Sequence, residues 1–540
     1  MAHFQKLNVL LRRQPPRQRR RHPFWRALGL VALILASALA RPAFHLSRAA
    51  WRDRPVPWPT LPAGHIDDAS RLNATQVAEV WDVPENEAQA EAQLAALLRR
   101  ARETHLPVAI AGARHSMGGH TIAPGGIIVN MLPFHRLELD ETNRVLRAGA
   151  GARWAEVLPF LAARGYSVAV MQASNNFTIG GSLSVNCHGW QPDSAPIAST
   201  VRAFRLMLAS GSVVWCSREE NGELFRAALG GYGLFGIILD ADIDVVPDAS
   251  YHIESCVIST QDYATVFAEK VRSVPAGSVD LAYGRISVAP ESFGREAILT
   301  LFHPTDPSAV AASAGPAPLP AAEPGVIDAL KRTIFRGSIA SNYGKSLRWQ
   351  AEKTLGEAFG KRSYRRSEIF NVPAELYANR TPGRTDILQE YFVPPARLAD
   401  FLERLREILA AHRRQAAASD PEAAAALPDL LNVTVRDVRH DSDTLLAYAQ
   451  GEDDVFGLVL LFEQAAHRAA AARAGAITRD LIEAALQMGG TYYLPYRLDA
   501  TPEQFRRCYP QAAEFFTLKR RYDPDESFQN EFYQTYGKAP

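Results

Sequence analysis

The sequence predicts an α+β protein in which two domains follow an N-terminal hydrophobic segment. Expected strands and helices alternate along the chain as far as Pro247, as they do in α+β and α/β domains. From residue 248 to residue 490 strand-like and helix-like segments mix in another pattern, which indicates a second domain of sheet and helices. A basic and then apolar leader precedes both domains.

The composition is that of a globular protein. The chain has 540 residues, of which 47% are hydrophobic and 22% are charged, so it is long enough for more than one domain. A net charge of +1 gives no indication of nucleic-acid binding. The four cysteines lack the spacing of metal ligands, so no metal site is predicted.

The leader has the features of an export signal. Residues 1–26 contain seven arginines and one lysine but no acidic residue, and the 14 residues from Ala27 to Ala40 are uncharged and mostly apolar. Residues 1–50 are therefore predicted to be a single-pass membrane anchor that leaves the rest of the chain outside the cytoplasm. The alternative is cleavage after Ala40, which gives a secreted or periplasmic protein. The proline-rich residues 51–72 are expected to form a tether.

The first domain is expected to span residues 73–247. Local patterns predict strands at 76–83, 107–112, 125–131 and 236–247, a strand–turn–helix unit at 144–165, a hairpin at 201–217, and helices at 84–105 and 222–229. The second domain spans residues 248–490. Residues 491–540 end in an aromatic-rich segment, which is expected to return to the first domain.

Three glycine-rich turns lie in the first domain, at residues 112–119, 178–190 and 230–238. The third contains G-x-G-x-x-G, but a helix precedes it and a strand follows, the reverse of the order in a nicotinamide-binding fold. No lysine of a nucleoside-triphosphatase loop follows any of the turns. Backbone N–H groups in such turns can still bind anions, so together the turns predict a site for an extended dinucleotide.

Four segments together resemble a known family. The segments "AGARHSMGGHT" (111–121), "TIGGSLSVNCHGW" (178–190), "ALGGYGLFGIILDADIDVVP" (228–247) and "RRYDPDESFQNEFYQTY" (520–536) are similar to motifs of the vanillyl-alcohol oxidase family. Members have a PCMH-type FAD-binding domain and a substrate domain. The nearest branches are the sugar-lactone and alditol oxidases and the decaprenylphosphoryl-ribose oxidases. The resemblance implies a two-domain flavoprotein with FAD as cofactor.

The resemblance also implies residues that bind FAD. These are Ala111, Gly112, Ala113, Arg114, His115, Ser116, Met117, Gly118, His120, Thr178, Gly180, Gly181, Ser182, Ser184, His188, Gly236, Ile237 and Tyr493. In relatives whose first turn reads "GHS", the histidine is bonded covalently to the flavin, and His115 matches it. Because Arg114 replaces the usual glycine, noncovalent FAD is the alternative.

The implied reaction is oxidation of a CH–OH group by hydride transfer to flavin, on a sugar-like, polyol or lactone substrate. Oxygen or a respiratory carrier then accepts the electrons. The second domain and the C-terminal segment offer Gln389, Tyr391, Arg436 and Tyr496 as candidate catalytic residues. Strand alternation puts Gln389 and Tyr391 on one face and Glu390 on the other, where Glu390 is either a base or a solvated charge.

Two other functions fit the same sequence. One is a flavin-dependent oxidoreductase of a lipid-linked or nucleotide sugar, and the other is a non-catalytic FAD-binding protein tethered to a membrane.

Overall fold

The computed structural model describes residues 23–305, 319, 325–359, 363–419, 426–451 and 453–538. The chain divides into two compact units, residues 1–48 and 49–540. Most of the arginines of the leader lie outside the described residues. In the first unit the described residues form most of helix α1 (Pro23–Arg52), whose last residues belong to the second unit.

The predicted membrane-spanning helix is not supported. Among the helices that the structure describes, none combines the length and the apolarity needed to cross a membrane. Helix α1 has 30 residues, but its uncharged run ends at Arg41. The 14 residues of that run rise by about 21 Å in a helix, which is less than the hydrocarbon thickness of about 30 Å.

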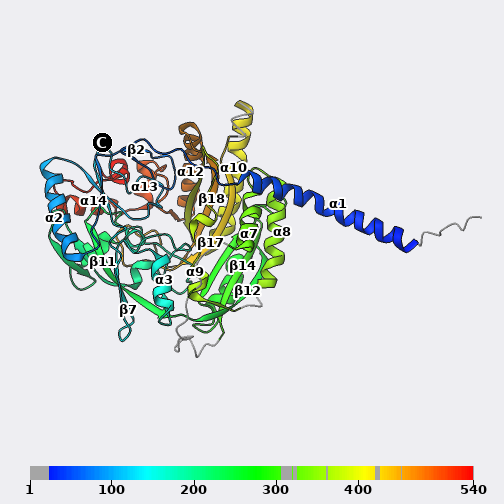
Figure 1. Ribbon diagram of the computed structural model, residues 1–540, viewed down its shortest axis with the longest axis horizontal. Helices are drawn as coiled ribbons and strands as arrows, with labels where there is room; N and C mark the ends of the chain where they lie inside the picture. The colour runs from blue at the N-terminus through cyan, green and yellow to red at the C-terminus, as the bar shows by residue number, and fades with distance from the viewer. Residues whose placement is uncertain are drawn as a thin grey trace, which may run out of the picture. The chain divides into compact units, whose positions relative to one another are not determined.

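The second unit is α+β, as the sequence predicts (Figure 1), and its described residues form four sheets. A two-stranded sheet pairs β1 (His65–Ile66) with β2 (Thr75–Gln76). A small parallel sheet has the order β3 (Glu79–Asp82), β5 (Ile127–Asn130), β4 (Val108–Ala111). Helix α2 (Glu87–Glu103) connects β3 to β4, the two outer strands, which both run parallel to β5 between them.

An antiparallel sheet completes the first half of the unit. Its order is β10 (Val213–Ser217), β9 (Val201–Met207), β11 (Ile237–Pro247), β7 (Val145–Gly149), β6 (Leu137–Asp140), with β8 (Tyr166–Val168) also on β11. Its short helices are α3 (Trp154–Ala162), α4 (Ile179–Ser184) and α5 (Gly222–Ala228). The hairpin predicted at 201–217 and the helix predicted at 222–229 are confirmed.

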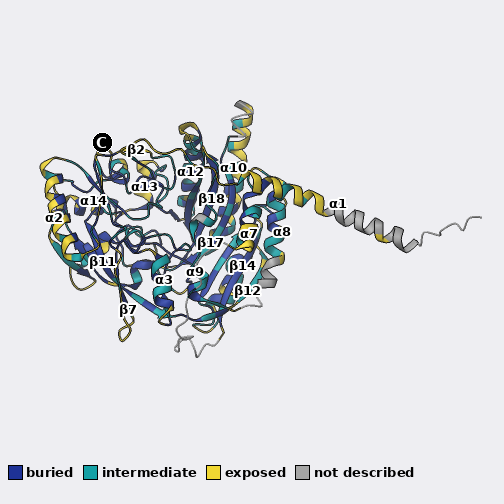
Figure 2. Ribbon diagram, viewed as in Figure 1, coloured by how far each residue is buried: buried dark blue, intermediate teal, exposed yellow. Residues whose placement is uncertain are grey.

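The second half contains a long antiparallel sheet. Its order is β15 (Tyr364–Arg365), β12 (Ser250–Ser259), β14 (Glu296–Pro304), β13 (Leu281–Ile286), β17 (Asp429–Val438), β18 (Val455–Ala465), β16 (Arg384–Val393), β19 (Thr491–Tyr492). The helices of this half are α6 (Tyr263–Phe267), α7 (Val326–Arg336), α8 (Asn342–Phe359), α9 (Arg366–Phe370), α10 (Leu398–Ser419) and α12 (Arg468–Gln487). Figure 2 shows that the central strands are buried.

The last part of the chain packs on the first half. Helices α13 (Pro502–Cys508) and α14 (Ala512–Tyr522) lie beside it in Figure 1, and the ring of Phe515 contacts that of Phe235. Beyond them, the buried Asn530 donates two hydrogen bonds of 2.9 Å, to the carbonyl groups of His120 and Tyr232. Its side-chain oxygen accepts a third from the N–H of Tyr533. One amide therefore fixes the end of the chain to two of the glycine-rich turns.

We expect Asn530→Ala to lower the free energy of unfolding by about 2–4 kcal/mol, because it leaves buried carbonyl groups without donors. The denaturant midpoint of the full chain measures this. Asn143→Ala is the matched control, since Asn143 lies in an exposed turn, and it should cost under about 1 kcal/mol. Equal losses in the two variants would contradict this role of Asn530.

Candidate active site

A cavity of about 330 Å³ lies between the glycine-rich turns and one face of the long sheet. All three turns line it, through residues such as Gly112, Gly181 and Gly236. The sheet contributes residues of β16, β17 and β18, and the C-terminal part adds Tyr493 and Tyr496. Segments that are far apart in the sequence therefore line one cavity, as is usual for a cofactor site.

The first turn follows strand β4 and lies very close to the second. A Cβ atom added at Gly112 would come within 2.1 Å of Thr178 Oγ1, so only glycine fits there. Two residues later, Arg114 has φ +55°, the left-handed conformation that glycine adopts most easily. The carboxylate of Asp68 accepts a hydrogen bond of 2.8 Å from the N–H of Gly119 and holds the other end of the turn.

The second turn contains a short helix that the glycine pattern alone does not predict. Thr178 caps α4, and its hydroxyl accepts a hydrogen bond from the N–H of Gly181 at 3.2 Å. One position before Gly181, a Cβ atom on Gly180 would lie 2.8 Å from the Cβ of Ala150. Both glycines line the cavity, where the backbone can approach a ligand closely.

The third turn is confirmed to lie between a helix and a strand, α5 and β11. Gly236 has φ +154°, and a Cβ atom there would meet the carbonyl oxygen of Met207 at 2.5 Å. The glycines are therefore needed for the path of the backbone. This order of elements provides no helix N-terminus in front of the turn for a nicotinamide cofactor.

Glu390 lies on the opposite wall and is 2% exposed. Its Oε1 is 2.8 Å from Nε2 of His188, and its Oε2 accepts a hydrogen bond of 3.2 Å from the hydroxyl of Tyr496. Arg436, from the neighbouring part of the sheet, donates to the carbonyl oxygen of His188 at 3.3 Å. A carboxylate, an imidazole, a phenol and a guanidinium thus gather at one end of the cavity.

Opposing effects act on the carboxyl of Glu390. Burial alone would raise its pKa, but the imidazole of His188, together with Arg436 and the Tyr496 hydroxyl, lowers the pKa below its usual value of 4.5. Burial raises the pKa of Tyr496 well above 10. At neutral pH the site therefore presents an ionised carboxylate beside a neutral phenol.

His115 in the first turn and His120, the residue directly after that turn, have different surroundings. The ring of His115 stacks on Phe177 at a centroid distance of 4.4 Å, and both line the cavity. His120 is 4% exposed and lies between the rings of Tyr232 and Phe532. Burial lowers the pKa of His120 to about 3, so this imidazole is neutral at physiological pH.

The residues present fit a bound dinucleotide. In the part of the chain that the structure describes, the hydroxyls of Ser116 and Thr121 and both ring nitrogens of His120 are buried without a hydrogen-bond partner. All three residues line the cavity. Buried polar atoms are rarely left unpaired, so these atoms are suited to a polar ligand. The adjacent glycines leave room for its backbone contacts.

The structure brings most of the predicted cofactor residues together. Those that line the cavity are Gly112, Ala113, Arg114, His115, Ser116, His120, Thr178, Gly180, Gly181, Ser184, His188, Gly236 and Tyr493. Those outside its lining are Ala111, Met117, Gly118, Ser182 and Ile237. The Ser182 hydroxyl points into the core instead, where it accepts from Trp154 and donates to Gln172, each at 2.9 Å.

Two of the four predicted catalytic residues do not line the cavity. Arg436 and Tyr496 line the cavity, but Gln389 and Tyr391 do not. The Tyr391 hydroxyl donates to Gln389 at 2.7 Å, and the Gln389 amide donates to Thr478 of α12 at 2.8 Å. Both side chains are buried on the face of β16 that α12 covers. Because neighbouring side chains of a strand point to opposite faces, Glu390 between them points toward the cavity.

Other lining residues have no counterpart in the sequence prediction. Polar residues at every second position of β17, Asn432 and Thr434, share the cavity face with Arg436. Period-two alternation from Arg436 would have found them. Gln172 and Thr121 also line the cavity, and Thr121 is the last residue of the first motif. The apolar lining from Leu388, Val459 and Leu461 gives no signal of its own in the sequence.

The comparison with protein families identifies the first half of this site. Residues 86–217 match the family described as an FAD binding domain, a range that includes the first two glycine-rich turns. The prediction of an FAD-binding domain is therefore confirmed. The matched range ends before the third turn and the long sheet, so it does not cover the wall that carries Glu390.

Individual relatives agree with this assignment. The chain is 34% identical over 159 residues to the FAD-dependent monooxygenase tpcD of Cochliobolus heterostrophus, covering 28% of this chain and 30% of the relative. It is 30% identical over 176 residues to a D-arabinono-1,4-lactone oxidase of Eremothecium gossypii, covering 32% and 33%. It is 25% identical over 453 residues to cytokinin dehydrogenase 1 of Oryza sativa subsp. japonica, covering 77% and 80%.

The chain spans between 30% and 40% of the length of the first curated relatives it matches. These three relatives bear the names of a monooxygenase, a lactone oxidase and a cytokinin dehydrogenase, so the shared part does not specify one substrate.

We expect Gly112→Ala to reduce FAD retention by about tenfold or more, because the added methyl group forces the first turn away from Thr178. Flavin content per purified protein, measured by absorbance, tests this. Gly222→Ala is the control, since its Cβ atom would meet nothing closer than 3.8 Å. Normal flavin content in Gly112→Ala would show that the contact between the turns does not shape the site.

Proposed function

We propose that the chain is an FAD-dependent oxidoreductase that oxidises a CH–OH group of a sugar-like, polyol or lactone substrate. The observation that carries this proposal is the buried Glu390 cluster, which faces the glycine-rich turns across one cavity. Bound FAD supplies the two-electron acceptor. Oxygen or a respiratory carrier is the proposed final acceptor.

The protein residues act on the substrate hydroxyl. Oxidation of a CH–OH group removes a hydride from carbon and a proton from oxygen. The ionised carboxylate of Glu390 accepts that proton, either directly or through the Tyr496 hydroxyl at 3.2 Å. His188 and Arg436 keep Glu390 ionised in a buried site, where a carboxyl would otherwise hold its own proton.

The lining favours a small substrate with several polar groups. Thr434 and Arg436 present a hydroxyl and a guanidinium on the cavity side of β17, and the buried Nε of Arg436 has no hydrogen-bond partner among the described residues. A hydroxyl or carbonyl oxygen of the substrate would satisfy that donor. Leu388 and Leu461 lie on the same wall and would cover the carbon skeleton.

We expect Glu390→Gln to lower kcat/KM by about 100- to 10,000-fold, because an amide does not accept the proton. Anaerobic bleaching of flavin absorbance with a panel of polyols, aldoses and lactones measures this. Since the folded pKa of Glu390 lies below 4.5, any acid limb that this group gives to wild-type activity should have its midpoint below pH 4.5.

Glu254→Gln is the control, because Glu254 lies on β12 and does not line the cavity. It should bleach as the wild type does. Full activity in Glu390→Gln would contradict the proposed base. Bleaching by NADPH without any alcohol would instead favour a reductase acting on a nucleotide or lipid-linked sugar.

We further propose that FAD is attached covalently through His115, which is placed on the cavity wall beside Phe177. We expect yellow colour to stay with acid-precipitated wild-type protein and to be released from His115→Ala. His135→Ala, which changes a histidine outside the cavity, should behave as the wild type. Free FAD in the wild-type supernatant would show noncovalent binding.

A further inference from the structure

Large hydrophobic side chains are exposed mainly in two parts of the described chain. These side chains are Leu28, Leu39, Phe44 and Trp51 on α1, Val56 and Leu61 in the tether, Val326, Ile327 and Leu330 on α7, and Val80 and Val257 elsewhere. Nine of the eleven therefore belong to the N-terminal segment or to α7. Single exposed hydrophobic residues are ordinary, but a group of three on one helix indicates an interaction surface.

Helix α7 is amphipathic, but it buries two arginines and exposes its aliphatic side chains. Its inward face buries Arg332, Phe335 and Arg336. Its outward face carries Val326, which is 89% exposed, together with Ile327 at 62% and Leu330 at 53%. Residues three and four apart lie on one side of a helix, so these three form one continuous apolar surface.

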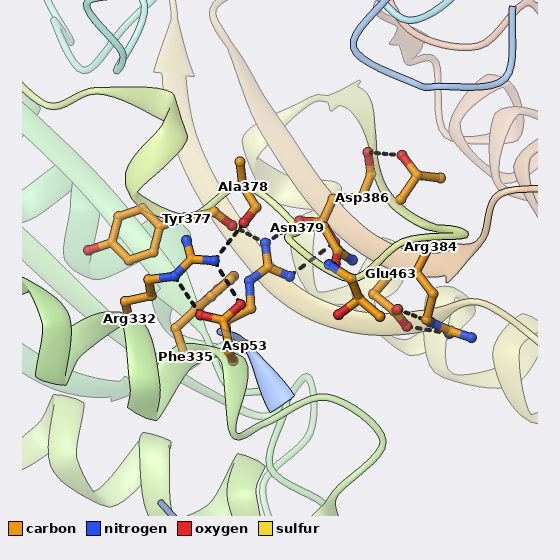
Figure 3. A network of polar contacts seen from close by, with 12 residues as sticks. Asp53, Arg332, Phe335, Tyr377, Ala378, Asn379, Arg384, Asp386 and Glu463 are labelled. Carbon is orange, nitrogen blue, oxygen red and sulfur yellow. Dashed lines mark hydrogen bonds and ion pairs between the residues drawn. The ribbon is translucent and has the colours of Figure 1, made fainter. Parts of the chain in front are cut away.

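Ion pairs hold the inward face, as Figure 3 shows. The guanidinium of Arg332 binds both carboxylate oxygens of Asp53, at 2.5 and 2.7 Å, and donates to the carbonyl groups of Leu376 and Ala378. Arg336 pairs with Asp386 of β16. The Arg332 and Asp53 side chains are 6% and 10% exposed. Because Asp53 directly follows α1, this pair fixes the start of the second unit under α7.

The chain that leads to Asp53 has the composition of a membrane-surface segment. Residues 1–26 contribute eight basic side chains and no acidic one, and an apolar run follows them. Clustered arginines attract anionic lipid headgroups, and apolar side chains next to them enter the interface. Because α1 ends at Arg52 and the next residue, Asp53, pairs with Arg332, the chain that carries this leader enters the second unit next to α7.

We propose that the outward face of α7, formed by Val326, Ile327 and Leu330, docks onto the surface of an anionic lipid bilayer. The aliphatic side chains enter the headgroup boundary, while the buried arginines keep the helix attached to the sheet. The contact is independent of the flavin site and does not require a membrane-spanning helix.

The test uses the full chain with a fluorophore on α7. Leu330→Cys in a Cys256→Ser background carries an environment-sensitive label, because the other three thiols are buried. With vesicles of phosphatidylglycerol and phosphatidylcholine, we expect a blue shift and a drop of roughly threefold or more in quenching by iodide. Vesicles of phosphatidylcholine alone should give a smaller effect.

The same label on Val257→Cys is the control, since Val257 is 50% exposed on β12. It should stay accessible to iodide. Flavin content must remain that of the wild type in both variants. Equal quenching at the two positions in the presence of vesicles would overturn the proposal. A blue shift without vesicles that grows with protein concentration would also overturn it, in favour of a second copy of the chain.

Discussion

The site depends on the close approach of the first two glycine-rich turns. Gly112 leaves no space for a side chain against Thr178, and Thr178 in turn caps α4. Thr178 thus limits how closely the two turns approach, and its hydroxyl also accepts a hydrogen bond from the N–H of Gly181. Since a hydrogen-bonded cap and a steric contact meet at the same residue, the two turns are expected to behave as one rigid support for the dinucleotide.

The opposite wall of the cavity depends on a buried charge, the carboxylate of Glu390. Glu390 stays charged in a buried position because His188, Arg436 and Tyr496 surround it. His188 belongs to the second glycine-rich turn, whereas Glu390 belongs to the long sheet. This contact therefore joins the second glycine-rich turn to the long sheet through a buried charge, for which removal of one partner is costly. The electrostatics of the site and the packing of the two halves depend on the same pair.

The residues predicted for the first wall came from the family resemblance, and thirteen of the eighteen cofactor residues that it implied line the cavity. The motifs that carry the resemblance are visible in the sequence because the backbone of their turns requires glycine, whereas the second wall has no such signal. Alternation on β16 was also predictable, but which face meets the cavity depends on where α12 packs. That contact joins residues 89 positions apart, so the sequence offered Gln389 and Tyr391 as catalytic candidates and left Glu390 as either a base or a solvated charge. Arg114 shows a similar limit, because its positive φ is set by the turn as a whole.

The first turn is held from both ends of the chain. Asp68 binds the N–H of Gly119 across 51 positions, and Asn530 binds the carbonyl of His120 across 410. The dinucleotide site is therefore complete only after the last segment has docked, which makes cofactor binding a consequence of folding the whole unit. Such long-range closure costs chain entropy but restricts the motion of the turn. A turn fixed in this way can keep His115 in one position relative to Phe177, and a reacting group gains rate from that preorganisation.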